Sequence, residues 1–184
     1  RQKIVAAVIG RKSAASAHES TPLELTVLDQ VIFAICREDS LQEKAEAAFR
    51  NLQTRFFDWN EVRVSSTAEL MEALAGLSNS RARAERITGF LQDHFEATYA
   101  FDLEGLLKKG VKGTSKQLEK APGMNDFTLA WVNQRALKAQ TIPVDSSTLR
   151  CAKRLELVDS AEDKIPAARE ALEGMVAKTK VIDF

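Results

Sequence analysis

Apolar residues recur through most of the chain at spacings of three and four, which is the period of an amphipathic helix. The segment that begins at Pro22 has apolar residues nearly all round the predicted helix, which ends in the charged residues Arg37-Glu38-Asp39. A helix without a polar face is covered by its neighbours, so we expect this one to be central and buried. Only residues 62–64 show the alternation of a strand. The pattern predicts an all-α protein of about ten short helices.

Local start signals place several of these helices. Ser40–Glu43 and Ser66–Glu69 have the capping-box pattern, in which a serine is followed three residues later by a glutamate. Over residues 81–95 the apolar positions again define one buried face. Three arginines of that helix are expected largely on its outer face: Arg81, Arg83 and Arg86.

Residues 115–138 are predicted to form two helices joined by a tight turn. Pro122 removes an amide donor and ends the first helix, whereas Gly123 can adopt backbone angles that other residues resist. Asn125 or Asp126 can cap the second helix. Unpaired amides at a helix start suit a phosphate, although many helical hairpins are simply corners.

Composition narrows the class of protein. The 184 residues include 26 basic and 26 acidic side chains, so any contact with DNA must come from a local patch. The most basic segment is 108–120, which has five lysines and one acid and leads into the predicted hairpin. A solvated loop and a phosphate-binding surface are both open interpretations of it. No apolar run approaches the roughly 20 residues of a membrane helix, so we expect no membrane partner.

The two cysteines, Cys36 and Cys151, lie far apart and each falls within an apolar helical pattern. We expect two reduced, buried thiols in a cytoplasmic protein. The sequence has neither a Cys-x-x-Cys pair nor Cys and His residues at metal-ligand spacing, so it predicts no metal cluster within this chain.

Two motifs together resemble a known family. The turn Ala121-Pro122-Gly123-Met124-Asn125 is followed by Ile142-Pro143-Val144-Asp145, in the order found in the helix-hairpin-helix DNA glycosylases of the endonuclease III superfamily. Pro22-Leu23-Glu24-Leu25 and the arginine-rich helix at 81–87 resemble further segments of that family. The resemblance covers roughly residues 20 to 172.

The resemblance implies two helical lobes with the hairpin at their junction. The contiguous lobe spans residues 21–138, and the second combines residues 1–20 with residues 139–184. It also implies a base-excision-repair protein that acts on double-stranded, damaged DNA as a monomer. DNA contacts would come from the amides of Gly123, Asn125 and Phe127 and from three nearby lysines: Lys112, Lys116 and Lys120.

The departures from the family bear directly on the chemistry. The lysine that forms a Schiff base in bifunctional members is matched here by Phe127, which has no amine. The family's carboxylate is matched by Asp145, which could stabilise a developing sugar cation, cap the helix near Ser146, or do both. Asn125 replaces a glycine, and Asp126 would repel phosphate unless it turns away or a cation intervenes. The family's intercalating glutamine falls near Cys36 or the next residue.

The resemblance also suggests metal sites. A monovalent cation, Na⁺ or K⁺, would be bound by the main-chain carbonyls of Glu119, Ala121 and Met124. Many members of the family carry an iron–sulfur cluster after the last helix, and such a cluster would require residues beyond Phe184.

Three functions remain open on the sequence alone. The first is a monofunctional glycosylase that hydrolyses an N-glycosidic bond with Asp145 and lacks Schiff-base lyase activity. The second is a non-catalytic DNA-binding relative, suggested by Phe127. The third is an all-α interaction module whose hairpin is only a corner, which the balanced charge and Asp126 favour.

Overall fold

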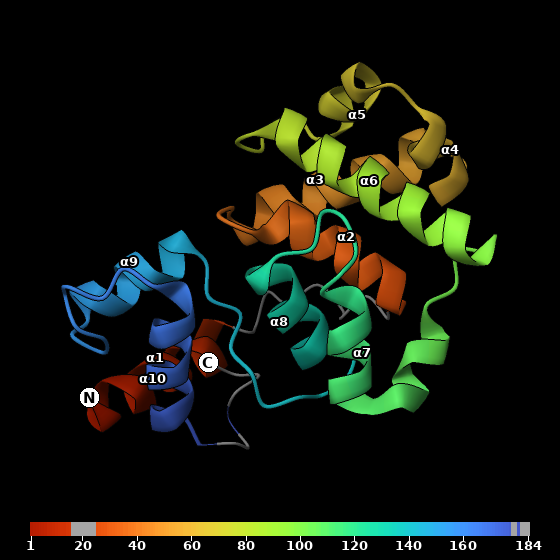
Figure 1. Cartoon of the computed structure of the whole chain (residues 1–184). Coiled ribbons are helices and arrows are strands. Elements are labelled where there is room, and N and C mark those ends of the chain that lie inside the picture. Colours follow the sequence, from red (N-terminus) through yellow and green to blue (C-terminus); the bar gives the residue numbers. More distant parts are fainter. Residues whose placement is uncertain (16–24, 178–179, 181–184) are drawn as a thin grey trace.

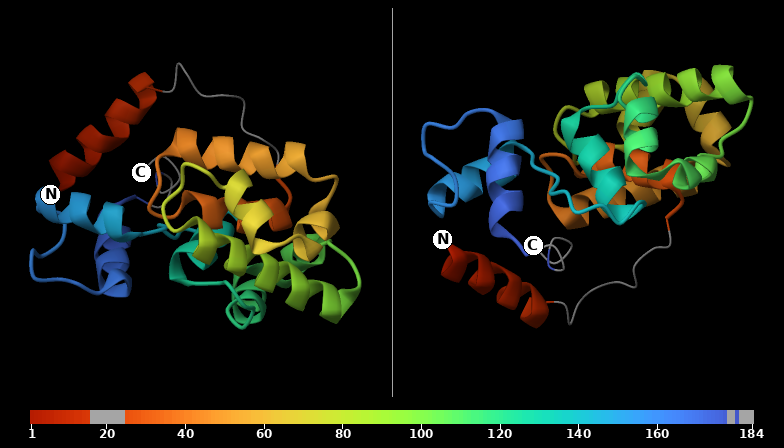
Figure 2. Two further views of the ribbon diagram at one scale, coloured as in Figure 1. Left: turned by 90° about the horizontal axis from the view of Figure 1, so that it is seen from above. Right: turned by 60° about the horizontal axis from the view of Figure 1, so that its bottom comes forward.

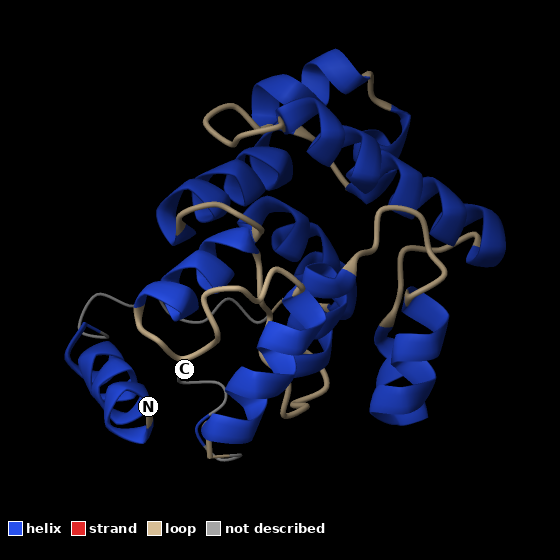
Figure 3. Cartoon of the chain, turned by 60° about the vertical axis from the view of Figure 1, so that its left-hand side comes forward, coloured by secondary structure: helices blue, strands red, loops and turns tan. Residues whose placement is uncertain are grey.

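The computed structural model describes residues 1–15, 25–177 and 180, and these form helices joined by loops, with no strand among them (Figure 3). The described elements, labelled in Figure 1, are α1 (Gln2–Ala15), α2 (Val27–Arg37), α3 (Gln42–Arg55), α4 (Trp59–Val64), α5 (Thr67–Ala73), α6 (Ser80–Thr98), the 3₁₀ helix η2 (Glu104–Lys109), α7 (Gly110–Leu118), α8 (Asp126–Arg135), α9 (Ser146–Arg154) and α10 (Ile165–Met175). The all-α fold class is therefore confirmed. None of the helices in these described ranges has both the length and the apolar character needed to cross a membrane.

Helix α2 is the centre of the larger core. Eight of its eleven residues are buried, and it packs against α3, α6 and α8. The helix begins with a capping box between Thr26 and Asp29 that was not predicted from the sequence. The proposed start at Pro22 lies outside the described residues. The prediction of a buried central helix over this segment is thus confirmed from Val27 onward.

The predicted capping boxes differ in outcome. Ser66 caps α5 and exchanges hydrogen bonds with Glu69, as expected. Ser40 caps nothing, because α3 begins one residue later than predicted, after Leu41. The Ser40 hydroxyl instead donates to the carbonyl of Glu38 at 3.2 Å. The capping prediction at Ser40 was therefore wrong, and this residue belongs to the corner between α2 and α3.

The expectation that Arg83 points outward was also wrong. Arg83 is only 5% exposed and donates to carbonyls at the end of α2, namely those of Ile35 and Glu38. It also donates to the Ser78 carbonyl at 2.8 Å. The last carbonyls of a helix have no partner within the helix. A buried guanidinium supplies several donors at once, which explains why a charged side chain is stable in this position.

Buried apolar residues fall into two clusters. The larger runs from α2 to α8. The smaller joins Val5 of α1 to residues between Ile142 and Val176, and Figures 1 and 2 show α1 in the same part of the molecule as α9 and α10. The exact lobe boundaries at residues 21 and 138 stay a prediction, because residues 16–24 are outside the described ranges.

The cysteines are not equivalent. Cys36 is buried, and burial, opposed by the charges of Arg83 and Arg86, raises the pKa of its thiol to about 12. Cys151 is exposed on α9, which contradicts the expectation that both thiols are buried. The apolar face of α9 consists of Leu149 and Ala152, so Cys151 falls on its outer side.

Candidate DNA-binding and glycosylase site

The hairpin turn between α7 and α8 is pressed against α6. Gly123 has a φ of 78°, and a Cβ at this position would lie 2.4 Å from the carbonyl oxygen of Arg86. Glycine is thus required both by the left-handed backbone and by the close approach. The Arg86 Nε donates to the Gly123 carbonyl at 2.8 Å. The backbone of Arg86 thus leaves room only for glycine at position 123, and its side chain hydrogen-bonds to the same turn.

Asn125 is the cap of α8. Its Oδ1 accepts a hydrogen bond from the Thr128 amide at 2.9 Å, which satisfies one of the unpaired amides of the helix start. Its Nδ2 donates to Glu38 Oε1 at 2.8 Å. Both the oxygen and the nitrogen of the Asn125 side-chain amide are thus hydrogen-bonded within the chain.

Asp126 is directed toward α10. Its Oδ2 lies 3.3 Å from a guanidinium nitrogen of Arg169, and the same nitrogen donates to the Asp126 carbonyl at 3.2 Å. Arg169 also donates to the Ile142 carbonyl at 3.1 Å. A neighbouring cation offsets the negative charge that would otherwise repel a phosphate at the hairpin.

Phe127 belongs to an aromatic cluster. The side chain is 5% exposed, and its ring centroid lies 6.0 Å from that of Trp131. Trp131 in turn lies 5.6 Å from Phe33 of α2. The Phe127 side chain therefore contributes to packing, and a phenyl ring cannot form a Schiff base.

Asp145 caps α9 and is only 2% exposed. Its Oδ1 accepts from the Thr148 amide at 2.7 Å and from the Ser147 hydroxyl at 2.9 Å. Its Oδ2 accepts from the amide of Asp39 at 2.9 Å. Burial raises the pKa of this carboxyl, but the hydrogen bonds from Thr148, Asp39 and Ser147 together outweigh burial and hold the pKa below its ordinary value. The group is thus a fixed negative charge that suits an adjacent cation better than it suits proton abstraction.

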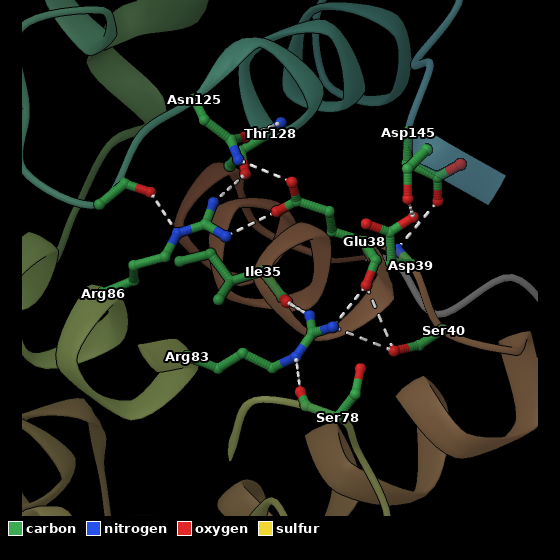
Figure 4. A network of polar contacts seen from close by, with 12 residues as sticks. Ile35, Glu38, Asp39, Ser40, Ser78, Arg83, Arg86, Asn125, Thr128 and Asp145 are labelled. Carbon is green, nitrogen blue, oxygen red and sulfur yellow. Dashed lines mark hydrogen bonds and ion pairs between the residues drawn. The ribbon is translucent and has the colours of Figure 1, made fainter. Parts of the chain in front are cut away.

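The corner after α2 joins these parts, and Figure 4 shows its contacts. Glu38 pairs with Arg86 at 2.6 Å and also accepts from Asn125. The next residue, Asp39, donates its amide to Asp145. The sequence pattern assigned no role to either acid, because neither belongs to a recognisable motif and their partners lie far away in the chain.

The basic segment is helical from residue 108 to residue 118, and its lysines lie on the surface. Lys112 and Lys116 are one turn apart on α7, and Lys120 follows the helix; all three are exposed. Within the part of the chain that the structure describes, none of them has an acid within ion-pairing distance. The 3₁₀ helix η2 precedes α7, and the Thr114 hydroxyl donates to the Leu106 carbonyl at 2.8 Å. The segment is thus a helical part of the surface, held by a hydrogen bond between α7 and η2, instead of a free loop.

The predicted cation ligands are chemically suitable. Main-chain carbonyl oxygens are good ligands for hard cations, and Glu119, Ala121 and Met124 all lie in or beside the turn. The Ala121 carbonyl also accepts the Met124 amide at 3.3 Å, which leaves its second lone pair for another partner.

The intercalating side chain was predicted near Cys36 or Arg37, and neither side chain projects freely from the α2–α3 corner. Cys36 is fully buried within α2. Arg37, next to it, donates from Nε to Gln42 at 3.1 Å and from another guanidinium nitrogen to the Ser40 carbonyl. Cys36 therefore lies inside the core, and Arg37 helps to hold the α2–α3 corner.

By sequence, the chain matches no protein-family model and no curated protein. By structure it is similar to endonuclease III in a non-covalent complex with DNA, with a TM-score of 0.73 and 14% identity over 100% of this chain and 82% of the other. It is similar to a thermostable thymine-DNA glycosylase, with a TM-score of 0.65 and 16% identity over the same shares. A third similar structure is the 3-methyladenine DNA glycosylase MagIII of H. pylori bound to 1,N6-ethenoadenine, with a TM-score of 0.71 and 11% identity over 99% of this chain and 91% of the other. The chain thus has the all-α fold of the endonuclease III-like, helix-hairpin-helix DNA glycosylases.

Proposed function

We propose that this chain binds damaged double-stranded DNA as a monomer and hydrolyses an N-glycosidic bond without lyase activity. The observation that carries the proposal is Asp145, a buried carboxylate with three hydrogen-bond donors at the start of α9. Such a group is held ionised and oriented before any substrate arrives. The similarity of fold to DNA glycosylases supports the same function.

The proposed reaction needs a cation-stabilising group and water. The damaged nucleotide is flipped out of the duplex, and the bond between C1′ and the base nitrogen breaks as the base leaves with the electron pair. Asp145 stabilises the positive charge that develops on the sugar. Water then adds to C1′, its proton passes to solvent, and the departing base takes a proton from solvent.

DNA binding would begin at the hairpin. The amides of Gly123, Asn125 and Phe127 are at or near the start of α8, where the helix dipole favours an anion. Lys112, Lys116 and Lys120 would add charge along the backbone. We include in this proposal a Na⁺ or K⁺ bound by the hairpin carbonyls.

The proposal is tested by base release from a panel of lesion-containing duplexes. The wild-type chain should release a base from at least one duplex, and Asp145→Asn should lower the single-turnover rate by about 100-fold or more. Borohydride added during the reaction should trap no covalent adduct, because Phe127 has no amine.

Glu43→Gln is the matched control, since Glu43 is an exposed acid on α3 and the substitution also removes one negative charge. It should release base at the wild-type rate. Failure of the wild type on every lesion would refute the glycosylase proposal, and a trapped adduct would refute the absence of Schiff-base chemistry.

The burial of Phe127 favours one second candidate, a DNA-binding relative without catalysis. The side chain at the lysine position is part of an aromatic cluster, so this position serves packing and supplies no nucleophile. This candidate predicts salt-sensitive binding to lesion duplexes, no base release, and unchanged affinity in Asp145→Asn. A band-shift assay at low and high salt distinguishes it from a chain with no affinity for DNA.

A further inference from the structure

Two consecutive acids at the end of α2 contact the capping residues of two different helices. Glu38 accepts a hydrogen bond from Asn125, the cap of α8. Asp39 donates its amide to Asp145, the cap of α9. The hairpin and the candidate acid come from segments about twenty residues apart, yet one dipeptide is bonded to both of them.

Glu38 is tied to the hairpin by more than one bond. Its Oε2 lies 2.6 Å from a guanidinium nitrogen of Arg86. The same guanidinium donates to Thr128 Oγ1 at 2.9 Å and to the Gly123 carbonyl. Glu38 therefore contacts the cap of α8 directly and the turn through Arg86.

Asp39 is tied to α9 by its side chain as well as by its amide. Its Oδ1 accepts from the Ser146 hydroxyl at 2.6 Å and from the Ser147 amide at 3.1 Å. Ser147 also donates its hydroxyl to Asp145. The Asp39 carboxylate thus orders Ser146 and Ser147, and Ser147 in turn donates to the Asp145 carboxylate.

The corner that carries both acids is itself held by hydrogen bonds from α6. Arg83 of α6 donates to the carbonyls of Ile35 and Glu38 and to the hydroxyl of Ser40 at 3.2 Å. Asp39 has a φ of 49°, a left-handed conformation that Asp and Asn tolerate better than most residues. Because these contacts hold the corner at the end of α2, the corner can in turn position the helix starts that Glu38 and Asp39 contact.

We propose that Glu38 and Asp39 are positioning residues that set the hairpin and Asp145 in register, with Glu38 acting on DNA binding and Asp39 acting on the chemical step. The inference rests on the proposed glycosylase function, but its geometric part concerns only contacts within this chain. It predicts that removing the two side chains has separable effects, because each side chain serves a different helix start.

The experiment measures affinity for a lesion duplex and single-turnover base release in Glu38→Ala and Asp39→Gly. Glu38→Ala should weaken affinity by about fivefold and leave the rate at saturating protein within about twofold of wild type. Asp39→Gly should lower that rate by about tenfold or more and leave affinity within about twofold. Glycine accepts the left-handed backbone and keeps the amide donor. Equal losses of affinity and rate in both variants would overturn the proposal.

Conservative variants separate positioning from direct chemistry. Asp39→Asn keeps an oxygen acceptor for Ser146 and Ser147 and tolerates the positive φ, so it should retain most of the rate. A loss in Asp39→Asn as large as that in Asp39→Gly would contradict positioning and indicate that the charge of Asp39 acts in the reaction. Asn125→Ser keeps a helix cap but loses the bond to Glu38, so it should weaken affinity as Glu38→Ala does.

A measurement that does not depend on catalysis distinguishes the proposed glycosylase function from the proposed positioning role of Asp39. Amide hydrogen exchange at Ser147 and Thr148 should accelerate in Asp39→Gly but not in Asp39→Asn, after thermal unfolding has shown that both variants fold. If Asp39→Gly does not fold, Ser146→Ala removes one of the same bonds and should also accelerate exchange. A wild type that releases no base, together with the predicted exchange pattern, would refute the glycosylase function alone. Unchanged exchange in the folded variants would refute the positioning role of Asp39.

Discussion

At the scale of single residues, Asp145 caps α9 and is also the residue to which we assign the proposed chemical step. Helix capping needs an oxygen that accepts from the first amides of α9, and stabilisation of a sugar cation needs a fixed negative charge nearby. The same three donors meet both needs, because they orient the carboxylate and favour its charged form. The two roles foreseen for this residue are thus compatible in the geometry.

The depressed pKa of Asp145 predicts how stability depends on pH. The pKa of the Asp145 carboxyl is lower in the folded than in the unfolded state. The ionised carboxylate therefore stabilises the fold at pH values above the pKa of the unfolded state, and this stabilisation is lost as the pH falls through the pKa of the folded state. Asp145→Asn should be about 1–2 kcal/mol less stable than wild type at pH 7. The difference should shrink in urea titrations at decreasing acid pH. A pH-independent difference would contradict the prediction.

Gly123 provides a second prediction for a single residue. Gly123→Ala should destabilise the chain by about 2 kcal/mol or more, because alanine is strained at positive φ and its Cβ would strike the Arg86 backbone. The control is Gly174→Ala on α10, where a Cβ meets nothing within 4 Å. This control should be neutral or stabilising by up to about 1 kcal/mol. Thermal and urea unfolding of both variants measure the contrast.

At the scale of elements, α7, the turn and α8 form one unit. The Ser115 hydroxyl oxygen lies 2.8 Å from Asn133 Nδ2 and 3.1 Å from Asn133 Oδ1, and these hydrogen-bond contacts tie α7 to α8. Lys112 and Lys116 lie on the exposed side of the same unit. These two lysines of the basic segment therefore belong to the same unit as the hairpin whose amides we propose as phosphate ligands.

Charge removal from α7 tests that arrangement. Lys112→Ala combined with Lys116→Ala should weaken DNA affinity at low salt and reduce the slope of log affinity against log salt by about 2, because two phosphates would no longer be neutralised. Lys44→Ala combined with Lys3→Ala is the control, because these exposed lysines lie on α3 and α1. An equal change in slope in the control pair would mean that α7 has no special part in binding.

At the scale of the whole molecule, two apolar clusters are joined by polar contacts. Asp39 connects the end of α2 to α9, and Arg169 connects α10 to the start of α8. Both connections meet the helix starts on which the proposed function depends. The relative placement of hairpin and acid is thus a property of the packing between the two clusters.

The Arg169 contact can be tested by a double-mutant cycle. Arg169→Met keeps much of the side-chain volume but leaves the Asp126 carboxylate without its cation, so DNA affinity should fall by about threefold to tenfold. Asp126→Asn in that background should restore most of the affinity, because the repelling charge is gone. Additive effects of the two changes would show that the pair is not coupled through charge.

Much of the local structure could be predicted because its signals are local. Helical spacing located the central helix, Pro122 and Gly123 located the turn, and Asn125 was one of two predicted caps. Each of these depends on backbone angles or hydrogen bonds within a few residues. The errors at Ser40 and Arg83 share one cause. Ser40 was expected to cap α3 and Arg83 to point outward, but both side chains bond to the end of α2.

The sequence by itself determined an all-α chain with a Pro-Gly turn, a helix-start acid at Asp145 and no amine at Phe127, since these depend on residue type and short-range spacing. Only the tertiary structure decided that Glu38 and Asp39 meet Asn125 and Asp145. Those contacts span 87 and 106 residues. The packing of α2 against α8, and the donors that its unpaired carbonyls recruit from α6, bring these groups together.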